Sequence, residues 1–185
     1  MRFYFRDDAP PTRDSRDICD FIEHGIQASR AYQEHLKQIA HRLPGPTRAF
    51  ALMPWYLDPK SHDCPHDGWL HRVEVQASVK EDRQVGLSIV LLGAYHDRIL
   101  KFTYSNVIKC RFDVANATGE NVGGWLADEV DLVEGHWVSH SILWQKGNPW
   151  EVVAREVRFE SKKGSPISVG GQGIKRVSFG PPSFS

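Results

Sequence analysis

The sequence predicts an α+β protein in which one N-terminal helix packs on a twisted antiparallel sheet of six or seven strands. Two observations carry this prediction. Residues 14–43 place apolar side chains at the three-and-four spacing of a helix with one buried face. After residue 68, apolar and polar side chains alternate, and short polar connections separate the runs, as between neighbouring antiparallel strands. We expect such a sheet either to curl toward a barrel or to split into a sandwich.

The helix is predicted from its apolar stripe and its ends. Asp14 or Ser15 can accept hydrogen bonds from free amides of the first turn, and Pro44 disfavours helical geometry at Leu43. Gly25 leaves open a division into two helices. The expected buried stripe consists of Ile18, Ile22, Ile26, Tyr32, Leu36, Ile39 and Leu43. A loop is expected between this helix and the first strand.

The second half of the chain is predicted as a meander of strands over residues 68–160. The expected strands are residues 69–79, 84–92, 98–105, 107–114, 125–132, 136–145 and 150–159. Residues 1–160 then form a single domain. Residues 161–185 differ, because Gly, Ser and Pro supply 14 of 25 positions and four Lys or Arg stand without an acid. This segment is predicted to be a flexible basic tail, either solvated or an arm that touches an acidic partner.

Composition narrows the class of protein. The 185 residues are 41% hydrophobic with six Trp and nine Phe, which suffices for one packed core. The net charge is zero, so the basic field of a nucleic-acid-binding protein is missing. Three widely spaced cysteines do not suggest a disulfide framework. The charged start and the lack of a long apolar run predict a cytoplasmic protein outside the membrane, and no cofactor motif occurs.

A histidine- and cysteine-rich stretch, "SHDCPHDGWLHRVEV", raises the possibility of a metal site. Its candidate ligands are His62, Cys64, His66 and His71. Zinc sites usually show paired Cys or His ligands separated by a loop, and Cys64 has no such partner. The favoured interpretation is a turn at "CPHDG" followed by a strand, with His71 as a hydrogen-bonded core residue.

The segment "WLADEVDLVEGHWVSHSILWQ" predicts a hairpin with a three-residue loop, residues 133–135, in which Gly135 takes the left-handed conformation. That register places Asp128 directly opposite His140 on an otherwise apolar face. An acid and an imidazole satisfy each other when buried together, so a structural ion pair is the favoured interpretation. The functional interpretation is a poised base in a cleft, in which His66, Asp67 and Glu129 join this pair.

The order of several segments resembles a group of small hypothetical bacterial proteins. The segments are "YQEHLKQIAHRLP", "HDGWLHRVEV", "LLGAYHDRILKFTYSNV", "DEVDL", "GHWVSHSILW" and "WEVVAREVRF". The resemblance covers about residues 30–160 and implies a helix, a His-Asp turn and a meander of strands. The positions that match the group's recurring polar residues are His66, Asp67, Asp128, Glu129 and His140. It implies no activity. Small proteins of this style also resemble toxin-immunity proteins, by analogy of fold alone.

The sequence leaves three functions open. The first is a non-enzymatic module that binds another protein, immunity-like or regulatory, with Trp55, Tyr56 and Trp150 as candidate surface anchors. The second is a hydrolase or metal-dependent enzyme that uses the His, Asp and Glu residues above. The third is a cup for a small molecule between sheet and helix. Because no catalytic sequence motif is present, the first is favoured.

Overall fold

The structure is a computed structural model that describes residues 15–54, 56, 58–77, 84–112, 123–146 and 149–164, with side chains from residue 25 onward. It confirms the α+β class. The described part contains the helices α1 (Ser15–Ile39) and α2 (Gly45–Ala51), joined by the 3-10 helix η1 (Ala40–Arg42). Within that part, no helix has both the length and the apolar character needed to cross a membrane.

Helix α1 matches the predicted helix and continues through Gly25 without a break. Its C-terminal half buries the predicted stripe residues Tyr32, Leu36 and Ile39, and Leu43 is buried directly after η1. Ile26 was wrongly placed in this stripe, since it is 49% exposed, and Ala28 is buried in its vicinity instead. The side chains of Ile18 and Ile22 lie outside the described residues.

Helix α2 was not predicted, because its seven residues are too few to show a helical period. Pro46 lies in its first turn, where a proline's fixed φ suits the helix and its missing amide costs nothing. Helix α2 packs against strand β8, and it buries Thr47, Phe50 and Ala51.

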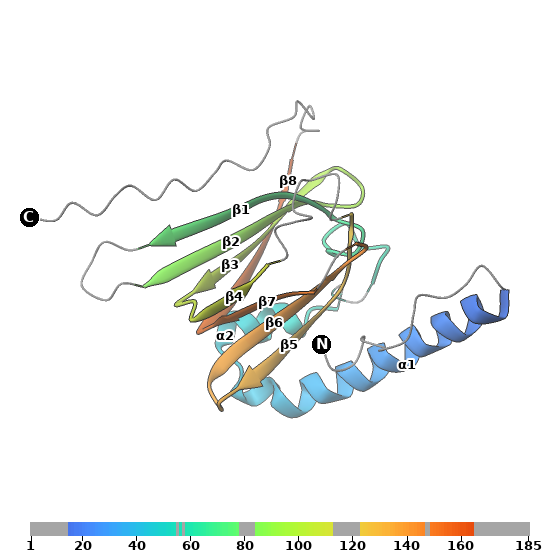
Figure 1. Ribbon diagram of the computed structural model, residues 1–185, viewed down its shortest axis with the longest axis horizontal. Coiled ribbons are helices and arrows are strands. Elements are labelled where there is room, and N and C mark those ends of the chain that lie inside the picture. Colours follow the sequence, from blue (N-terminus) through green and yellow to red (C-terminus); the bar gives the residue numbers. More distant parts are fainter. Residues whose placement is uncertain are drawn as a thin grey trace, which may run out of the picture.

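The strands form two antiparallel sheets of four strands each (Figure 1). One sheet has the order β1-β2-β3-β8 and the other the order β4-β7-β6-β5. The strands are β1 (Trp69–Ala77), β2 (Val85–Leu92), β3 (Arg98–Ser105), β4 (Lys109–Arg111), β5 (Trp125–Val133), β6 (Trp137–Trp144), β7 (Trp150–Ala154) and β8 (Glu156–Lys163). Of the two expected forms, curling toward a barrel or splitting, the structure shows the split into two sheets.

One bend explains why the described part has eight strands where the sequence predicted seven. The run predicted as one strand over residues 150–159 turns at Arg155, so β7 belongs to one sheet and β8 to the other. The Arg155 amide donates to the Ser105 carbonyl at 2.9 Å, where β3 ends. Asn106 follows with a left-handed φ of 51°, and the chain crosses to β4. Strand β8 also continues to Lys163, past the predicted domain boundary, while residues 165–185 of the predicted tail lie outside the described part.

The edges of both sheets are capped by hydroxyl groups from the helices. Thr47 donates to the Val157 carbonyl at 3.1 Å and accepts from the Val157 amide at 2.9 Å, on the free side of β8. On β5, the Tyr32 hydroxyl accepts from the Val130 amide at 2.5 Å and contacts the Val130 carbonyl at 3.5 Å. Because buried backbone groups need partners, each hydroxyl stands in for a missing neighbouring strand.

Aromatic side chains fill the space between the two sheets. Phe50 of α2 contacts Phe102 with ring centroids 5.3 Å apart, and Phe102 stacks on Trp125 at 5.0 Å. Trp144 contacts both Trp125 and Trp150. The largest fully buried side chains include Trp125, Trp144, Tyr32, Tyr104, Phe50 and Phe102. The apolar side chains that alternate along the predicted strands thus face one shared interior.

Candidate functional site

The predicted acid–histidine pair exists and lies deep in this interior. Asp128 of β5 is 6% exposed and His140 of β6 is 0% exposed. Asp128 Oδ2 lies 2.8 Å from His140 Nε2. The pair sits between the sheets, where Phe50, Phe102 and Trp125 contact the imidazole with ring centroids 5.6–5.8 Å away. The sequence predicted this contact from alternation together with a hairpin register.

The predicted register of the hairpin was wrong by two residues. Val133 pairs with Trp137, so the loop is residues 134–136, and His140 stands directly opposite Val130. Both Glu134 (φ 50°) and Gly135 (φ 77°) take left-handed backbone in this loop. A shift of two residues keeps every side chain on its original face, because side chains alternate with period two. Asp128 and His140 are therefore diagonal neighbours and still meet.

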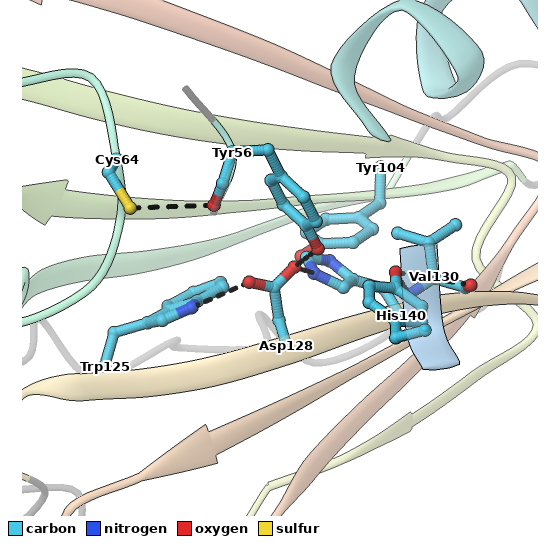
Figure 2. A network of polar contacts seen from close by, with 8 residues as sticks. Tyr56, Cys64, Tyr104, Trp125, Asp128, Val130 and His140 are labelled. Atoms are coloured by element: carbon cyan, nitrogen blue, oxygen red, sulfur yellow. Dashed lines mark hydrogen bonds and ion pairs between the residues drawn. The ribbon is translucent and has the colours of Figure 1, made fainter. Parts of the chain in front are cut away.

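Three donors converge on the Asp128 carboxylate (Figure 2). Trp125 Nε1 donates to Oδ1 at 3.0 Å, the Tyr56 hydroxyl donates to Oδ2, and His140 Nε2 lies at the same oxygen. Since a carboxylate only accepts, His140 donates through Nε2–H. A buried carboxylate with three donors is satisfied within the protein.

Tyr104 extends the chain of hydrogen bonds on the other side of the imidazole. Its hydroxyl lies 2.7 Å from His140 Nδ1, and it donates there when the neutral imidazole carries its proton on Nε2. Burial, with a smaller effect of the Asp128 carboxylate, raises the pKa of Tyr104 well above its ordinary value. Burial is also the largest cause that raises the pKa of Tyr32 and of Tyr56 well above the ordinary value, and the Asp128 carboxylate is the second. The tyrosines therefore stay protonated and available as donors.

We call Tyr56, Tyr104, Trp125, Asp128 and His140 the buried network. Its residues come from the loop after α2 and from strands β3, β5 and β6, so it ties both sheets to the helical segment. All five residues are at most 6% exposed. Aromatic rings pack around the imidazole, and the hydrogen bonds of the network link the elements that supply its residues.

Two of the predicted surface anchors belong to the core. Tyr56 is 4% exposed, and Trp150 is 2% exposed and packs on Trp144. Both were wrongly placed on the surface, because an aromatic residue in a polar-looking loop gives no sign of where its ring points. Trp55 lies outside the described residues.

The predicted catalytic residues do not gather in one cleft. His66 and Asp67 lie in the turn before β1, where His66 Nδ1 is 3.2 Å from Asp67 Oδ2, and their side chains are 42% and 56% exposed. Asp67 also accepts from the Gln145 amide group at 3.3 Å. Glu129 is buried, yet it points to the face of β5 opposite to Asp128. The buried pair and the exposed turn are thus separate groups.

The turn itself forms as predicted. Gly68 donates its amide to the Pro65 carbonyl at 2.8 Å, and a Cβ at Gly68 would lie only 2.8 Å from the same oxygen. Asp67 has a left-handed φ of 59°, and its amide donates to the Trp125 carbonyl at 2.7 Å. The turn therefore joins the start of β1 to the start of β5.

The candidate metal ligands also separate. Within the described residues, which include all four candidates, no three Cys, His, Asp or Glu side chains are placed to hold a metal ion. His62 Nδ1 contacts Asp97 Oδ2 at 2.8 Å, while Cys64 is buried and donates to the Tyr56 carbonyl at 3.6 Å. Burial raises the pKa of the Cys64 thiol to about 11, so it is protonated at neutral pH.

His71 is exposed, which corrects its predicted place in the core. Strand β1 has a bulge between Leu70 and Arg72, which shifts its register against β2 by one residue. The bulge reverses the alternation, so that Leu70 and Val73 contact the core while Trp69 is 56% exposed.

A cluster of exposed rings was missed. His62 stacks on Tyr95 with centroids 4.2 Å apart, and Trp69 contacts His96 edge-on at 6.2 Å. We call these four residues the aromatic rim. Trp69 is 56% exposed and Tyr95 49% exposed, although both are large apolar side chains. The available signal was the tight turn "GAYHD", in which Gly93 accepts from the His96 amide at 2.8 Å.

Comparison with known proteins adds no role for these residues. No protein-family model, curated protein or solved structure matches the chain. The assignment of roles therefore depends on geometry and chemistry.

Proposed function

We propose that the chain is a cytoplasmic, non-enzymatic protein-binding module, of the immunity-like or regulatory kind, and that the aromatic rim is its recognition surface. The observation that carries the proposal is the grouping of exposed rings at His62, Trp69, Tyr95 and His96. Tyrosine and tryptophan are enriched at the centres of protein interfaces, where they lose water contact at low entropic cost. A bacterial origin, suggested by the resemblance, belongs to the same proposal.

The loops hold the rim in place, which favours recognition without reorganisation. The Tyr95 hydroxyl donates to the Pro59 carbonyl at 3.4 Å, and His62 is held by Asp97. The His96 backbone is fixed in a left-handed conformation with φ 58°. Preorganised side chains spare the partner the cost of ordering them.

The enzymatic alternative depends on the buried network. Its Tyr104–His140–Asp128 chain has the hydrogen-bond order of a proton relay. Its burial is the reason to prefer a structural role, since general acid–base catalysis requires contact with the substrate. The aromatic side chains between the sheets likewise disfavour a small-molecule cup.

The test compares partner recovery by matched surface variants. Trp69→Ala and Tyr95→Ala remove rim rings, whereas Ile108→Ala removes an apolar side chain of equal exposure (56%) beyond the far end of β3. Tagged full-length proteins are used to capture partners from the source organism, followed by quantitative mass spectrometry and binding measurements with the purified partner.

We expect one stoichiometric partner with wild type and with Ile108→Ala, and at least about a tenfold weaker affinity with each rim variant. If the rim variants recover the partner as well as wild type does, the rim is not the recognition surface. If no stoichiometric partner is recovered with any form, the protein-binding function is wrong.

A further inference from the structure

Strand β1 differs from the other long edges of the two sheets. It pairs with β2 on one side only. Along its other side, the described residues supply one bridge, from Trp69 to Gly124, and no strand of the described part pairs with the main chain from Leu70 to Ala77. The corresponding edges of β8 and β5 are capped by Thr47 and Tyr32. An open edge of this length is a template for pairing with another strand.

The charges on β1 indicate which strand pairs with this edge. Arg72 and Glu74 flank Val73, and their side chains are 54% and 35% exposed. Directly opposite residues of antiparallel strands interact through their side chains. If two copies of β1 pair with Val73 at the centre, Arg72 of each copy lies opposite Glu74 of the partner subunit. Centring the pair on Arg72 or on Glu74 would instead place like charges together.

We infer that this chain forms a two-fold symmetric dimer in which β1 pairs with β1 of a second copy, centred on Val73. A two-fold interface must be complementary to itself, and the sequence Arg-Val-Glu has this property. The pairing joins two four-stranded sheets into one continuous sheet. It concerns assembly and is independent of the function proposed for the aromatic rim.

The pairing also extends a charge contact that already exists within β1. Arg72 Nε lies 3.1 Å from Glu74 Oε1 in the same strand. In the dimer, each carboxylate gains a second guanidinium from across the two-fold axis, so four charges alternate in sign on one face. The bulge before Arg72 ends the regular pairing on that side, so about the Val73 centre the residues in regular pairing are Arg72, Val73 and Glu74 of each copy. The dimer is therefore expected to be salt-sensitive.

Sedimentation equilibrium of the full chain tests the inference with charge exchanges. Wild type is expected to show a concentration-dependent rise from one to two times 21.0 kDa. Arg72→Glu and Glu74→Arg each place like charges opposite each other in a homodimer, so each variant is expected to dimerise at least about tenfold more weakly. An equimolar mixture restores opposite charges at both positions and is expected to regain the wild-type affinity.

Strand β8 offers a matched control. Arg158 and Glu156 form an equivalent contact two residues apart, with Nη2 3.3 Å from Oε1, on a strand whose edge is covered. Arg158→Glu is therefore expected to dimerise like wild type. The exchange R72E/E74R keeps the self-complementary pattern and is expected to dimerise as well, which guards against a variant that simply misfolds. Circular dichroism checks that each variant is folded.

Several results would overturn the inference. Wild type that stays at 21.0 kDa over the whole concentration range shows that no dimer forms. Single variants that dimerise as tightly as wild type place the interface elsewhere. A mixture that stays monomeric while both single variants are folded shows that Arg72 and Glu74 do not face each other.

Discussion

Removal of the His140 side chain is expected to destabilise the protein strongly. In His140→Ala, Asp128 loses one of its three donors but keeps Trp125 and Tyr56. The Tyr104 hydroxyl loses its partner at Nδ1. The substitution also leaves a void beneath the Phe50 ring, because His140 is fully buried.

The size of the effect follows from these losses. A buried hydroxyl left without a partner costs about 1–3 kcal/mol. A hydrogen bond to a carboxylate contributes about 1.5–3 kcal/mol, and truncating a fully buried ring adds the cost of the void it leaves. These terms overlap, so we expect the free energy of unfolding to fall by about 3–5 kcal/mol. At about 2–4 °C per kcal/mol for a domain of this size, the melting temperature falls by about 6–20 °C.

Urea denaturation of wild type and variant, followed by circular dichroism, measures this change. His71→Ala is the matched control, because His71 lies exposed on β1 and its loss is expected to change stability by less than about 0.5 kcal/mol. A double-mutant cycle with Asp128→Ala isolates the coupling between the two residues. If His140→Ala changes the free energy of unfolding by less than about 1 kcal/mol, the structural role assigned to the buried network is refuted.

Three further predictions concern other parts of the fold. Thr47→Val is expected to cost about 1–3 kcal/mol in urea denaturation and to speed hydrogen exchange at the Val157 amide, whereas Thr47→Ser retains stability. The buried tyrosines have pKa values raised by burial, so the unfolded chain loses protons that the folded chain keeps. Stability is therefore complete below about pH 10 and falls above it, by up to about 1.4 kcal/mol per pH unit and tyrosine, which denaturation midpoints between pH 8 and pH 11 would reveal. Cys64, with its pKa raised to about 11, is expected to resist a thiol reagent that labels exposed Cys110, as site-resolved mass spectrometry would show, until the protein unfolds.

The sequence predicted the elements that follow from the period of apolar residues. It did not predict the features that depend on particular contacts. Helix α1 and most strand bounds follow from repeated apolar spacing, which many residues report together. The bend at Arg155 breaks no period, because residues on both sides of it continue to alternate, so one strand was predicted where two exist. The bulge at β1 inserts one residue without a proline or glycine to mark it, and it reversed the predicted exposure of His71.

The buried network shows the same limit. Asp128 and His140 were matched because they lie 12 positions apart in one hairpin, where alternation fixes their common face. Tyr56 lies 72 positions from Asp128, and its contact is set by the path of the loop after α2, which has no period. Tyr104 was predicted to lie in a strand, yet nothing in the sequence states which strand packs across from it. Contacts between layers therefore could not be predicted from one sequence.

Burial decides what each acid–histidine contact of this protein can do. The contacts His140–Asp128 and His62–Asp97 share the same chemistry and the same 2.8 Å distance. The side chains of the second pair are 50% and 43% exposed, and such a pair contributes only about 0–1 kcal/mol to stability because water screens it. That exposure leaves its imidazole, stacked on Tyr95, accessible to a partner. His62→Ala is therefore expected to weaken binding and leave the denaturation midpoint unchanged. His140→Ala, in contrast, is expected to lower stability. If His62→Ala lowered stability as much as His140→Ala does, burial would not be what separates the two pairs.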